Sequence, residues 1–416
     1  MTVTDLKSAK DLAPSVLEIK KFQKNKKGAH PIKFILGKHR LEDFRDVDMV
    51  FKAAGVPLDS VYITEARKNG VPVFMDDALF AREAPCQIIG ITGTRGKTTT
   101  SNLIYEIAKT TGKKIYFGGN VRGMATLPLL EKVKKNNLVI LELSSWQLQG
   151  WRDLKISPEI SVVTNIYPDH QNYYKNSMAK YVYDKEAIFA NQTKNDFLVL
   201  NKNCAWCRKM AKKAKSKVVW FSANDVPRGW KLKILGEHNL ENIAAAVAVG
   251  KLLRLPVAKI KKVVENFRGV PGRLEFVREV RGVKYYNDTT STMPEATIAA
   301  LRAIGGKNII LICGGADKNL NMEKFAQVIL EKVKGVVFLK GQGTEKIMMA
   351  MKKNNPEISL DDFPMVESME KAVELASREA EKGDVVLLSP GASSFGLFAN
   401  EFDRGDKFKE AVKRLK

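Results

Sequence analysis

The residues with the clearest chemical meaning lie between Ile88 and Thr100, which read IIGITGTRGKTTT. A short apolar run leads into a glycine-rich turn and then into a helical pattern, an order typical of strand, loop and helix. Gly93 and Gly96 would let the backbone approach a phosphate, and N–H groups of the loop and the helix start would face it. Lys97 would add a positive charge, and the Thr98 hydroxyl would reach Mg²⁺. The stretch therefore predicts a nucleotide phosphate site.

This loop matches a variant of the common phosphate-loop pattern, TGTxGKTT, because Ile91 stands where that pattern has a glycine six residues before the lysine. A bare GKT triplet is weak evidence for a nucleotide site. The position of this one, behind an apolar strand and before a helix, favours nucleotide phosphates over a purely structural glycine turn.

Other polar side chains follow predicted strand ends or lie on a helix. Glu142 ends the strand LVILEL, Asp169 and His170 follow a strand in TNIYPDH, and Lys185 lies in the helical stretch YVYDKEAIF, fifteen residues beyond His170. Open α/β sheets gather ligand groups at the carboxyl ends of strands, so Glu142 is a candidate Mg²⁺ ligand. Each residue taken alone is more often an exposed acid, a structural histidine or a solvated lysine, and only their combination favours a site.

The elements that must position these residues alternate along the chain as apolar strands and helical patterns, which predicts an α/β fold with parallel sheets. Three domains are expected: a Rossmann-like N-terminal domain at 1–84, a central domain with a parallel sheet of the P-loop ATPase kind at 85–269, and a Rossmann-like C-terminal domain at 270–416. The Gly- and Pro-containing stretch RGVPGR at 268–273 is the expected linker between the second and third domains.

The expected N-terminal domain begins at a strand whose end carries Asp5. A nucleotide-binding βαβ unit usually has another strand and a glycine turn before such an acidic strand end, and neither stands before Thr2. The domain is therefore expected to be truncated. Either the gene start was assigned too late, which we favour, or the domain is naturally shorter.

Composition indicates a globular protein, since 28% of the 416 residues are charged and 44% are hydrophobic. No segment resembles a signal peptide or a bilayer-spanning run, so a cytoplasmic protein without a membrane partner is expected. The net charge of +23 would suit nucleic acid or acidic metabolites. The lysines are spread along the chain and no nucleic-acid reading module is recognisable, so no nucleic-acid partner is expected.

Four cysteines occur, at positions 86, 204, 207 and 313. Cys204 and Cys207 have the spacing of metal-ligand or redox pairs, but no second pair lies at the distance typical of zinc sites. Buried or idle thiols are the favoured interpretation.

Seven separated motifs together resemble the Mur ligase family: TGTRGKTTT, LELSSWQL, TNIYPDH with a lysine fifteen residues later, GEHNLEN, the arginine of PGR, YYNDTT and LLSPGASSF. They occur in the family's order, from about Thr2 to the C-terminus. The resemblance implies an ATP-dependent amide ligase of peptidoglycan precursor synthesis, acting as a monomer. It would join D-glutamate to UDP-N-acetylmuramoyl-L-alanine through an acyl phosphate, with the third domain closing on the second.

The resemblance also implies roles for single residues. The catalytic residues would be Lys97, His170 and Lys185. ATP would be contacted by Gly93, Thr94, Gly96, Lys97, Thr98, Thr99, Asn239, Asn242, Arg273 and Asp288. Two Mg²⁺ ions would be held by Thr98, Glu142, His170 and Lys185. Lys185 would be carbamylated, which replaces an ammonium by a carboxylate-like oxygen ligand. The substrates would be bound by Asp5, Gly55 and Asn120 for the UDP-sugar and by Thr292, Lys318, Ser394 and Phe395 for D-glutamate.

One further departure from the family concerns the motif NDTTST, where many members have a lysine and this chain has Thr290. One contact to an acidic substrate is therefore in question. Two alternatives stay open beside the D-glutamate ligase. One is a nucleotide-binding protein that has lost ligation, and the other is a related Mur- or folylpolyglutamate-type ligase with another substrate.

Overall fold

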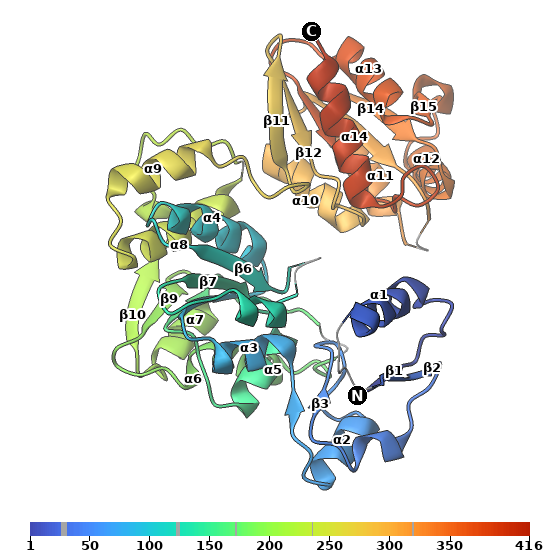
Figure 1. Cartoon of the computed structure of the whole chain (residues 1–416). Helices are drawn as coiled ribbons and strands as arrows, with labels where there is room; N and C mark the ends of the chain where they lie inside the picture. Colours follow the sequence, from blue (N-terminus) through green and yellow to red (C-terminus); the bar gives the residue numbers. More distant parts are fainter. Residues whose placement is uncertain (26–30, 122–124, 171–172, 235, 318–319) are drawn as a thin grey trace.

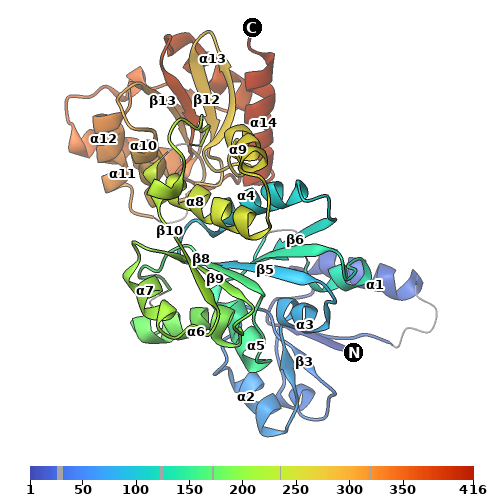
Figure 2. The same ribbon diagram turned by 90° about the vertical axis from the view of Figure 1, so that its left-hand side faces the viewer.

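The computed structural model describes residues 1–25, 31–121, 125–170, 173–234, 236–317 and 320–416. Its elements form three groups along the chain; the C-terminal group lies above the N-terminal group in both views, and the central group lies to their left in Figure 1 and between them in Figure 2. Each group contains parallel strands, so the expected α/β class is confirmed. The domain boundaries at 84/85 and 269/270 stay predictions. Of the helices in the described ranges, none is long and apolar enough to cross a membrane.

The central group is built on a six-stranded parallel sheet of order β10-β9-β8-β5-β7-β6. Its strands are β5 (Gln87–Thr92), β6 (Ile115–Gly119), β7 (Leu138–Glu142), β8 (Ile160–Val163), β9 (Phe197–Asn201) and β10 (Lys217–Phe221). Almost every residue of β5, β7 and β8 is buried, because helices cover both faces. Since β5 lies between β7 and β8, the carboxyl ends of these three strands are neighbours.

Two apolar layers hold helices against the central sheet. One layer contains residues of α3 (Asp76–Glu83), α5 (Ser145–Asp153), α6 (Met178–Ala190) and α7 (Ala205–Ala211). The other contains residues of α4 (Lys97–Lys109), α8 (Glu237–Leu252) and α9 (Val257–Asn266). Strand residues alternate between the two layers, as Ile88 and Ile89 do on β5, because successive side chains point to opposite faces.

The N-terminal group differs in detail from the single parallel sheet that the sequence predicted. It has two separate two-stranded parallel pairs, β1 (Thr2–Asp5) with β2 (Lys33–Leu36) and β3 (Val50–Phe51) with β4 (Val73–Phe74). Helix α1 (Ala13–Asn25) buries no residue, and α2 (Val61–Lys68) buries Ile63 and Ala66. The second strand pair is only two residues long, so few ladder bonds are available to extend it into a larger sheet.

The C-terminal group has a second six-stranded sheet, of order β11-β12-β16-β13-β14-β15. Its strands are β11 (Glu275–Val280), β12 (Val283–Asn287), β13 (Ile309–Gly314), β14 (Gly335–Leu339), β15 (Met365–Val366) and β16 (Val385–Leu388). A turn at Arg281 and Gly282 joins β11 to β12 as an antiparallel hairpin, and the other neighbouring strands are parallel. One face packs against α10 (Pro294–Ile304), α11 (Glu323–Lys332) and α12 (Gln342–Asn354), and the other against α13 (Met369–Glu379) and α14 (Glu401–Arg414).

The four cysteines carry free thiols in this fold. Cys86, Cys207 and Cys313 are buried and Cys204 is half-buried, which agrees with the interpretation as buried thiols. In the described part of the chain no three His, Cys, Asp or Glu side chains gather in a way that could hold a metal ion.

Candidate active site

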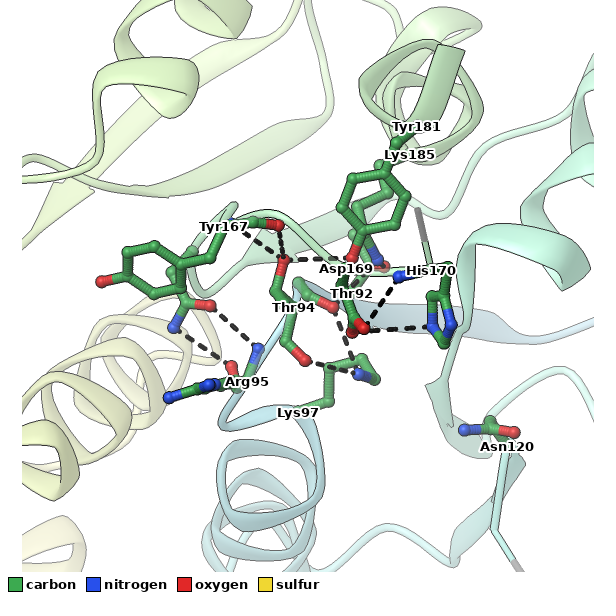
Figure 3. Close-up of polar contacts among 12 residues, drawn as sticks. Thr92, Thr94, Arg95, Lys97, Asn120, Tyr167, Asp169, His170, Tyr181 and Lys185 are labelled. Carbon is green, nitrogen blue, oxygen red and sulfur yellow. Dashed lines mark hydrogen bonds and ion pairs between the residues drawn. The ribbon is translucent and has the colours of Figure 1, made fainter. Parts of the chain in front are cut away.

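The phosphate loop, residues 93–96, follows β5 and is held in shape by the segment that follows β8 (Figure 3). The Thr94 N–H donates to the carbonyl oxygen of Asn165 at 2.9 Å, and the Arg95 N–H donates to the Asn165 side-chain oxygen at 2.9 Å. The Asn165 amide in turn donates to the Arg95 carbonyl at 3.1 Å. The loop is therefore fixed by its neighbour strand, and α4 begins directly after it at Lys97.

Both loop glycines lie in the left-handed region and against neighbouring protein atoms. Gly93 has φ 147°, and a Cβ there would lie 1.9 Å from the Thr164 hydroxyl oxygen. Gly96 has φ 80°, and a Cβ there would lie 2.2 Å from the Asn242 side-chain oxygen. Sequence reasoning explained these glycines by the approach of a phosphate. The structure adds that close packing of the protein around the loop requires them as well.

Lys97 folds back over this loop. Its amine donates to the carbonyl oxygens of Gly93 at 3.2 Å and Thr94 at 3.1 Å. Burial lowers the pKa of Lys97, while the charges of Glu142 and Asp169 act in the opposite direction. The amine is thus a partly desolvated cation at the loop, which suits an anionic ligand.

Lys185 of α6 reaches the same loop from the other side (Figure 3). Only 2% of it is exposed, and its amine donates to the Gly93 carbonyl at 2.9 Å and to the Thr92 hydroxyl at 3.3 Å. Burial lowers the pKa of Lys185 well below its usual value, and the charge of nearby Lys97 lowers it further. Both effects favour the uncharged amine. The solvated surface lysine that Lys185 taken in isolation would suggest is therefore wrong.

Tyr181, which sequence reasoning missed, connects Lys185 to the phosphate loop. Its hydroxyl lies 3.0 Å from the Thr94 hydroxyl, and its ring centroid lies 4.9 Å from the Lys185 amine. The spacing of four residues between Tyr181 and Lys185 on one helix was a signal for this neighbourhood.

Glu142 ends β7 beside this loop and is 2% exposed. One of its carboxylate oxygens accepts a long hydrogen bond of 3.4 Å from the Asn120 amide. The other oxygen is buried and has no hydrogen-bond partner among the described residues. A buried carboxylate oxygen without a donor is costly, and a cation would satisfy it. Glu142 therefore fits a Mg²⁺ ligand.

His170 follows β8 and lies in a different environment from Glu142. It adopts φ 51°, its ring centroid lies 4.6 Å from that of Trp146, and its Nε2 lies 3.6 Å from an Asp169 oxygen. Both His170 and Asp169 are partly exposed. Mg²⁺ prefers oxygen ligands, so the fit to this metal depends on Glu142 and the Thr98 hydroxyl more than on the imidazole.

Two predicted ATP contacts on α8 face the phosphate loop. The Asn242 amide donates to the Asn239 side-chain oxygen at 2.9 Å, and the Asn242 oxygen accepts from the Thr100 hydroxyl at 3.3 Å. Both asparagines are buried. The structure thus brings Asn242 against Gly96, although 146 residues separate them in the sequence.

The predicted ATP contacts of the C-terminal group lie on two adjoining segments. Asp288 is 4% exposed and accepts hydrogen bonds from the Leu274 N–H at 3.0 Å and from the hydroxyls of Ser291 at 2.5 Å and Ser389 at 2.7 Å. Burial raises the pKa of Asp288 to about 6. In this structure its carboxylate organises the surrounding loops, and contact with ATP stays a prediction.

Arg273 lies close enough to Lys97 in the central group and to Asp288 in the C-terminal group to affect both electrostatically. Its charge contributes to lowering the pKa of Lys97 and acts downward on that of Asp288, against the effect of burial. A residue at the start of the C-terminal group is therefore close enough to Lys97 to affect its pKa, and contact of Arg273 with ATP stays a prediction.

Thr290, at the position where the family resemblance leads us to expect a lysine, makes a contact that sequence reasoning missed. Its hydroxyl donates to the Gly272 carbonyl at 2.8 Å, and its N–H donates to the same oxygen at 3.0 Å. The threonine therefore ties the loop after β12 to the residue preceding Arg273.

The predicted substrate residues are dispersed over several loops. Thr292 follows β12 and is half-buried, while Ser394 and Phe395 follow β16, Ser394 buried and Phe395 69% exposed. Lys318 lies outside the described residues. Asn120 adjoins Glu142, as its hydrogen bond shows.

The two N-terminal substrate positions lie apart from these contacts. The carboxylate of Asp5 accepts a hydrogen bond from the Lys7 N–H at 2.8 Å. Gly55 has space around it, because a Cβ there would meet no atom within 4 Å. Neither observation tests a role in binding the UDP-sugar.

Comparison with known proteins places this geometry in context. Residues 91–232 match the Mur ligase middle domain, and residues 272–391 match the Mur ligase, glutamate ligase domain. The chain is 37% identical to the UDP-N-acetylmuramoylalanine-D-glutamate ligase of Roseiflexus sp. strain RS-1 over 447 residues, covering 99% of this chain and 92% of that protein. It is 35% identical to the ligase of the same name from Borreliella burgdorferi over 437 residues, covering 100% and 92%.

Solved structures with similar folds are more distant in sequence. A UDP-N-acetylmuramoyl-L-alanyl-D-glutamate-2,6-diaminopimelate ligase superposes with a TM-score of 0.60 at 18% identity, covering 88% of this chain and 94% of that one. A UDP-N-acetylmuramate-alanine ligase from Thermotoga maritima superposes with a TM-score of 0.58 at 19% identity, covering 100% and 99%. At these identities the likeness concerns the fold.

Proposed function

This chain belongs to the Mur ligase family, and on that premise we propose that it joins D-glutamate to UDP-N-acetylmuramoyl-L-alanine in peptidoglycan precursor synthesis, using ATP. The observation that carries the proposal is the near full-length similarity to ligases named for this reaction. The geometry around the phosphate loop supports it, because buried and partly desolvated amines meet there beside a carboxylate oxygen that no donor among the described residues reaches.

In the first step, the carboxylate of the UDP-sugar substrate attacks the γ-phosphorus of ATP. An acyl phosphate forms and ADP leaves. Both reactants are anions, so their encounter needs positive charge close to the phosphates. The loop N–H groups and the Lys97 amine supply it from the protein, with Asn239, Asn242 and Arg273 as further contacts to ATP. Mg²⁺, held by Thr98, Glu142 and His170, would neutralise part of the phosphate charge.

Carbamylation of Lys185 completes this proposed metal site. The uncharged amine attacks CO₂, an N–C bond forms, and the nitrogen loses a proton to solvent, which leaves a carbamate anion. The buried position of Lys185 and its lowered pKa support this reaction, because an ammonium cannot attack CO₂. The product presents oxygen ligands of the kind that Mg²⁺ prefers.

In the second step, the amine of D-glutamate attacks the acyl carbon. A tetrahedral intermediate forms, and phosphate leaves as the amide is made. We propose that the loops after β12 and β16, which carry Thr292, Ser394 and Phe395, orient the amino acid, with Lys318 as a further contact. Asp5, Gly55 and Asn120 would bind the UDP-sugar. We expect the enzyme to act in the cytoplasm as a monomer, and light scattering after size exclusion measures the second expectation.

The test is phosphate release with purified protein, ATP and Mg²⁺. We expect release that requires both UDP-N-acetylmuramoyl-L-alanine and D-glutamate. Turnover with L-lysine or meso-diaminopimelate but none with D-glutamate would identify a related ligase with another substrate. ATP binding without turnover of any amino acid would identify a nucleotide-binding protein that has lost ligation.

A further inference from the structure

Arg404 of α14 is a fully buried cation with an unusual set of partners. It has 0% exposure, and in the described ranges no carboxylate lies within ion-pair distance of it. Its three nitrogens donate to the Thr289 hydroxyl at 3.1 Å, the Thr289 carbonyl at 2.8 Å and the Ala392 carbonyl at 3.3 Å. Burial lowers the pKa of Arg404 to about 10, so the side chain still carries its charge at neutral pH.

These partners belong to two different loops at one edge of the C-terminal sheet. Thr289 lies in the loop after β12, and Ala392 lies in the loop after β16. The loops also contact each other, since the Gly391 N–H donates to the Ser291 carbonyl at 2.9 Å. Arg404 therefore spans the junction of the two loops and holds a backbone carbonyl of each.

The helix that carries Arg404 is pressed against the first of these loops. A Cβ at the adjacent Gly405 would lie 2.6 Å from the Thr289 methyl carbon and 3.1 Å from the Asn287 side-chain nitrogen. The Thr289 hydroxyl also donates to the Glu401 carbonyl at 2.7 Å. The position of α14 and the position of the loop after β12 thus depend on each other.

We propose that Arg404 is a positioning residue for the amino-acid substrate: it fixes the loops after β12 and β16 together, and its positive charge, which the charge of Glu401 offsets only in part, favours a dicarboxylate amino acid bound between them. This inference deepens the proposed function and rests on it, because those loops carry Thr292 and Ser394. A planar guanidinium suits the task, since its fork of N–H groups reaches acceptors on both loops at once, which a lysine ammonium cannot do.

Stability alone gives a weaker account of this arginine. A buried charge without an ion-pair partner costs free energy of desolvation, and an apolar side chain of similar volume avoids that cost. Arg404 offsets the cost only by satisfying two buried carbonyls and a hydroxyl. The Arg404 charge gains a function if it attracts the substrate, because an amino acid with two carboxylates and one ammonium has a net negative charge.

The test compares Arg404→Lys and Arg404→Met in the full chain with Arg414→Met, which makes the same chemical change at an exposed position of α14. Steady-state kinetics are measured with D-glutamate and with the neutral analogue D-glutamine. Formation of the acyl phosphate is measured without amino acid by positional isotope exchange in ATP. Wild-type turnover with D-glutamate tests the proposed function separately from these variants.

We expect Arg404→Met to raise the KM for D-glutamate by about tenfold or more and to lower the preference for D-glutamate over D-glutamine, with acyl-phosphate formation within a few-fold of wild type. Arg404→Lys should keep the charge preference but raise both KM values, and Arg414→Met should match wild type. The inference would be overturned if Arg404→Met lost acyl-phosphate formation and amide formation equally. It would also be overturned if the preference for D-glutamate over D-glutamine were unchanged. If Arg404→Met does not fold, Thr289→Val tests the same inference, because it removes the hydroxyl that accepts a hydrogen bond from Arg404. This variant should raise the KM for D-glutamate but not the KM for ATP.

Discussion

The amine of Lys185 lies 2.9 Å from the carbonyl oxygen of Gly93, although 92 residues separate them in the chain. This contact joins the middle of α6 to the phosphate loop after β5. It removes Lys185 from water and places it near Lys97, whose charge adds to the effect of burial on its pKa. The contact therefore places a buried amine, whose pKa is lowered by burial and by Lys97, beside the loop where the proposed carbamate would supply an oxygen ligand.

We expect Lys185→Ala to lose most ligase activity and to regain part of it when formate or acetate is added. A short carboxylate can occupy the place of the carbamate and supply its oxygens. Lys185→Arg should stay inactive because a guanidinium remains a cation there. Phosphate release with and without added carboxylate measures both. Lys180→Ala, at an exposed position of the same helix, is the control, and carbamylation would be wrong if activity were indifferent to CO₂ and to residue 185.

Replacing Gly96 tests how tightly the protein surrounds the phosphate loop. Gly96→Ala should reduce ATP affinity and turnover by about 10²-fold, since the new Cβ clashes with Asn242 and displaces the loop by a fraction of an ångström or more. Gly112→Ala is the matched control, because Gly112 has φ 79° but no atom within 4 Å of a Cβ. Both variants bear the strain of a positive φ, so equal effects of the two on ATP affinity would contradict the packing argument.

Removing the hydroxyl of Tyr181 should loosen the phosphate loop without unfolding the helix. Tyr181→Phe loses the contact to Thr94, a change of about 0.5–1.5 kcal/mol. We expect a several-fold lower kcat and a normal melting temperature within a few degrees. Tyr183→Phe, which removes an exposed hydroxyl two residues along the same helix, should match wild type. A Tyr181→Phe enzyme with wild-type kinetics would show that the contact does not matter for turnover.

Glu142→Gln should weaken the dependence on Mg²⁺ and abolish most activity. The substitution keeps the shape of the side chain and removes the charge that fits a cation. Because it also removes a buried carboxylate oxygen that has no hydrogen-bond partner in the described part of the chain, the metal-free variant should unfold at the same temperature as the metal-free wild type or at a higher one. Mg²⁺ titrations of phosphate release and calorimetry with chelator measure the two effects. An unchanged Mg²⁺ requirement would remove Glu142 from the proposed metal site.

The buried side chain of Asp77, which lies outside the candidate active site, should make the stability of the fold depend on pH. Its carboxylate is fully buried in α3, one oxygen accepts from the Trp151 indole at 2.7 Å, and the other has no partner in the described part of the chain. Burial raises the pKa of Asp77 from 3.8 to about 7. The folded protein therefore holds a proton that the unfolded chain releases, and this contribution to stability declines as pH rises from about 4 to about 7.

Asp77→Asn should flatten that decline and raise the melting temperature at pH 8 relative to wild type. The amide oxygen still accepts from Trp151, and the cost of burying a charge disappears. Melting curves between pH 5 and 8 measure the effect, with Asp76→Asn at the exposed neighbouring position as control. A variant with the same pH dependence as wild type would show that Asp77 is ionised in the folded protein over this whole range.

Much of the site could be read from the sequence because its signals are local. The order of strand, glycine loop and helix from Ile88 to Thr100 can be predicted from residues that are adjacent in the sequence. Short apolar runs likewise predict the strands that end at Glu142 and before Asp169. The family resemblance added an order of motifs along the chain. Hydrophobic periodicity likewise predicted the two large sheets, although it did not predict that the N-terminal strands form two separate pairs.

What only the tertiary structure decided is the environment of each side chain. The local pattern around Lys185, taken alone, favoured a solvated residue, and packing of α6 against β5 buries it. No local pattern indicates that Glu142 keeps one oxygen without a donor among the described residues, that Tyr181 contacts Thr94, or that Arg404 holds two loops together. Burial and hydrogen bonding depend on residues far apart in the chain that pack into one place, so they are fixed only when the layers of the fold come together.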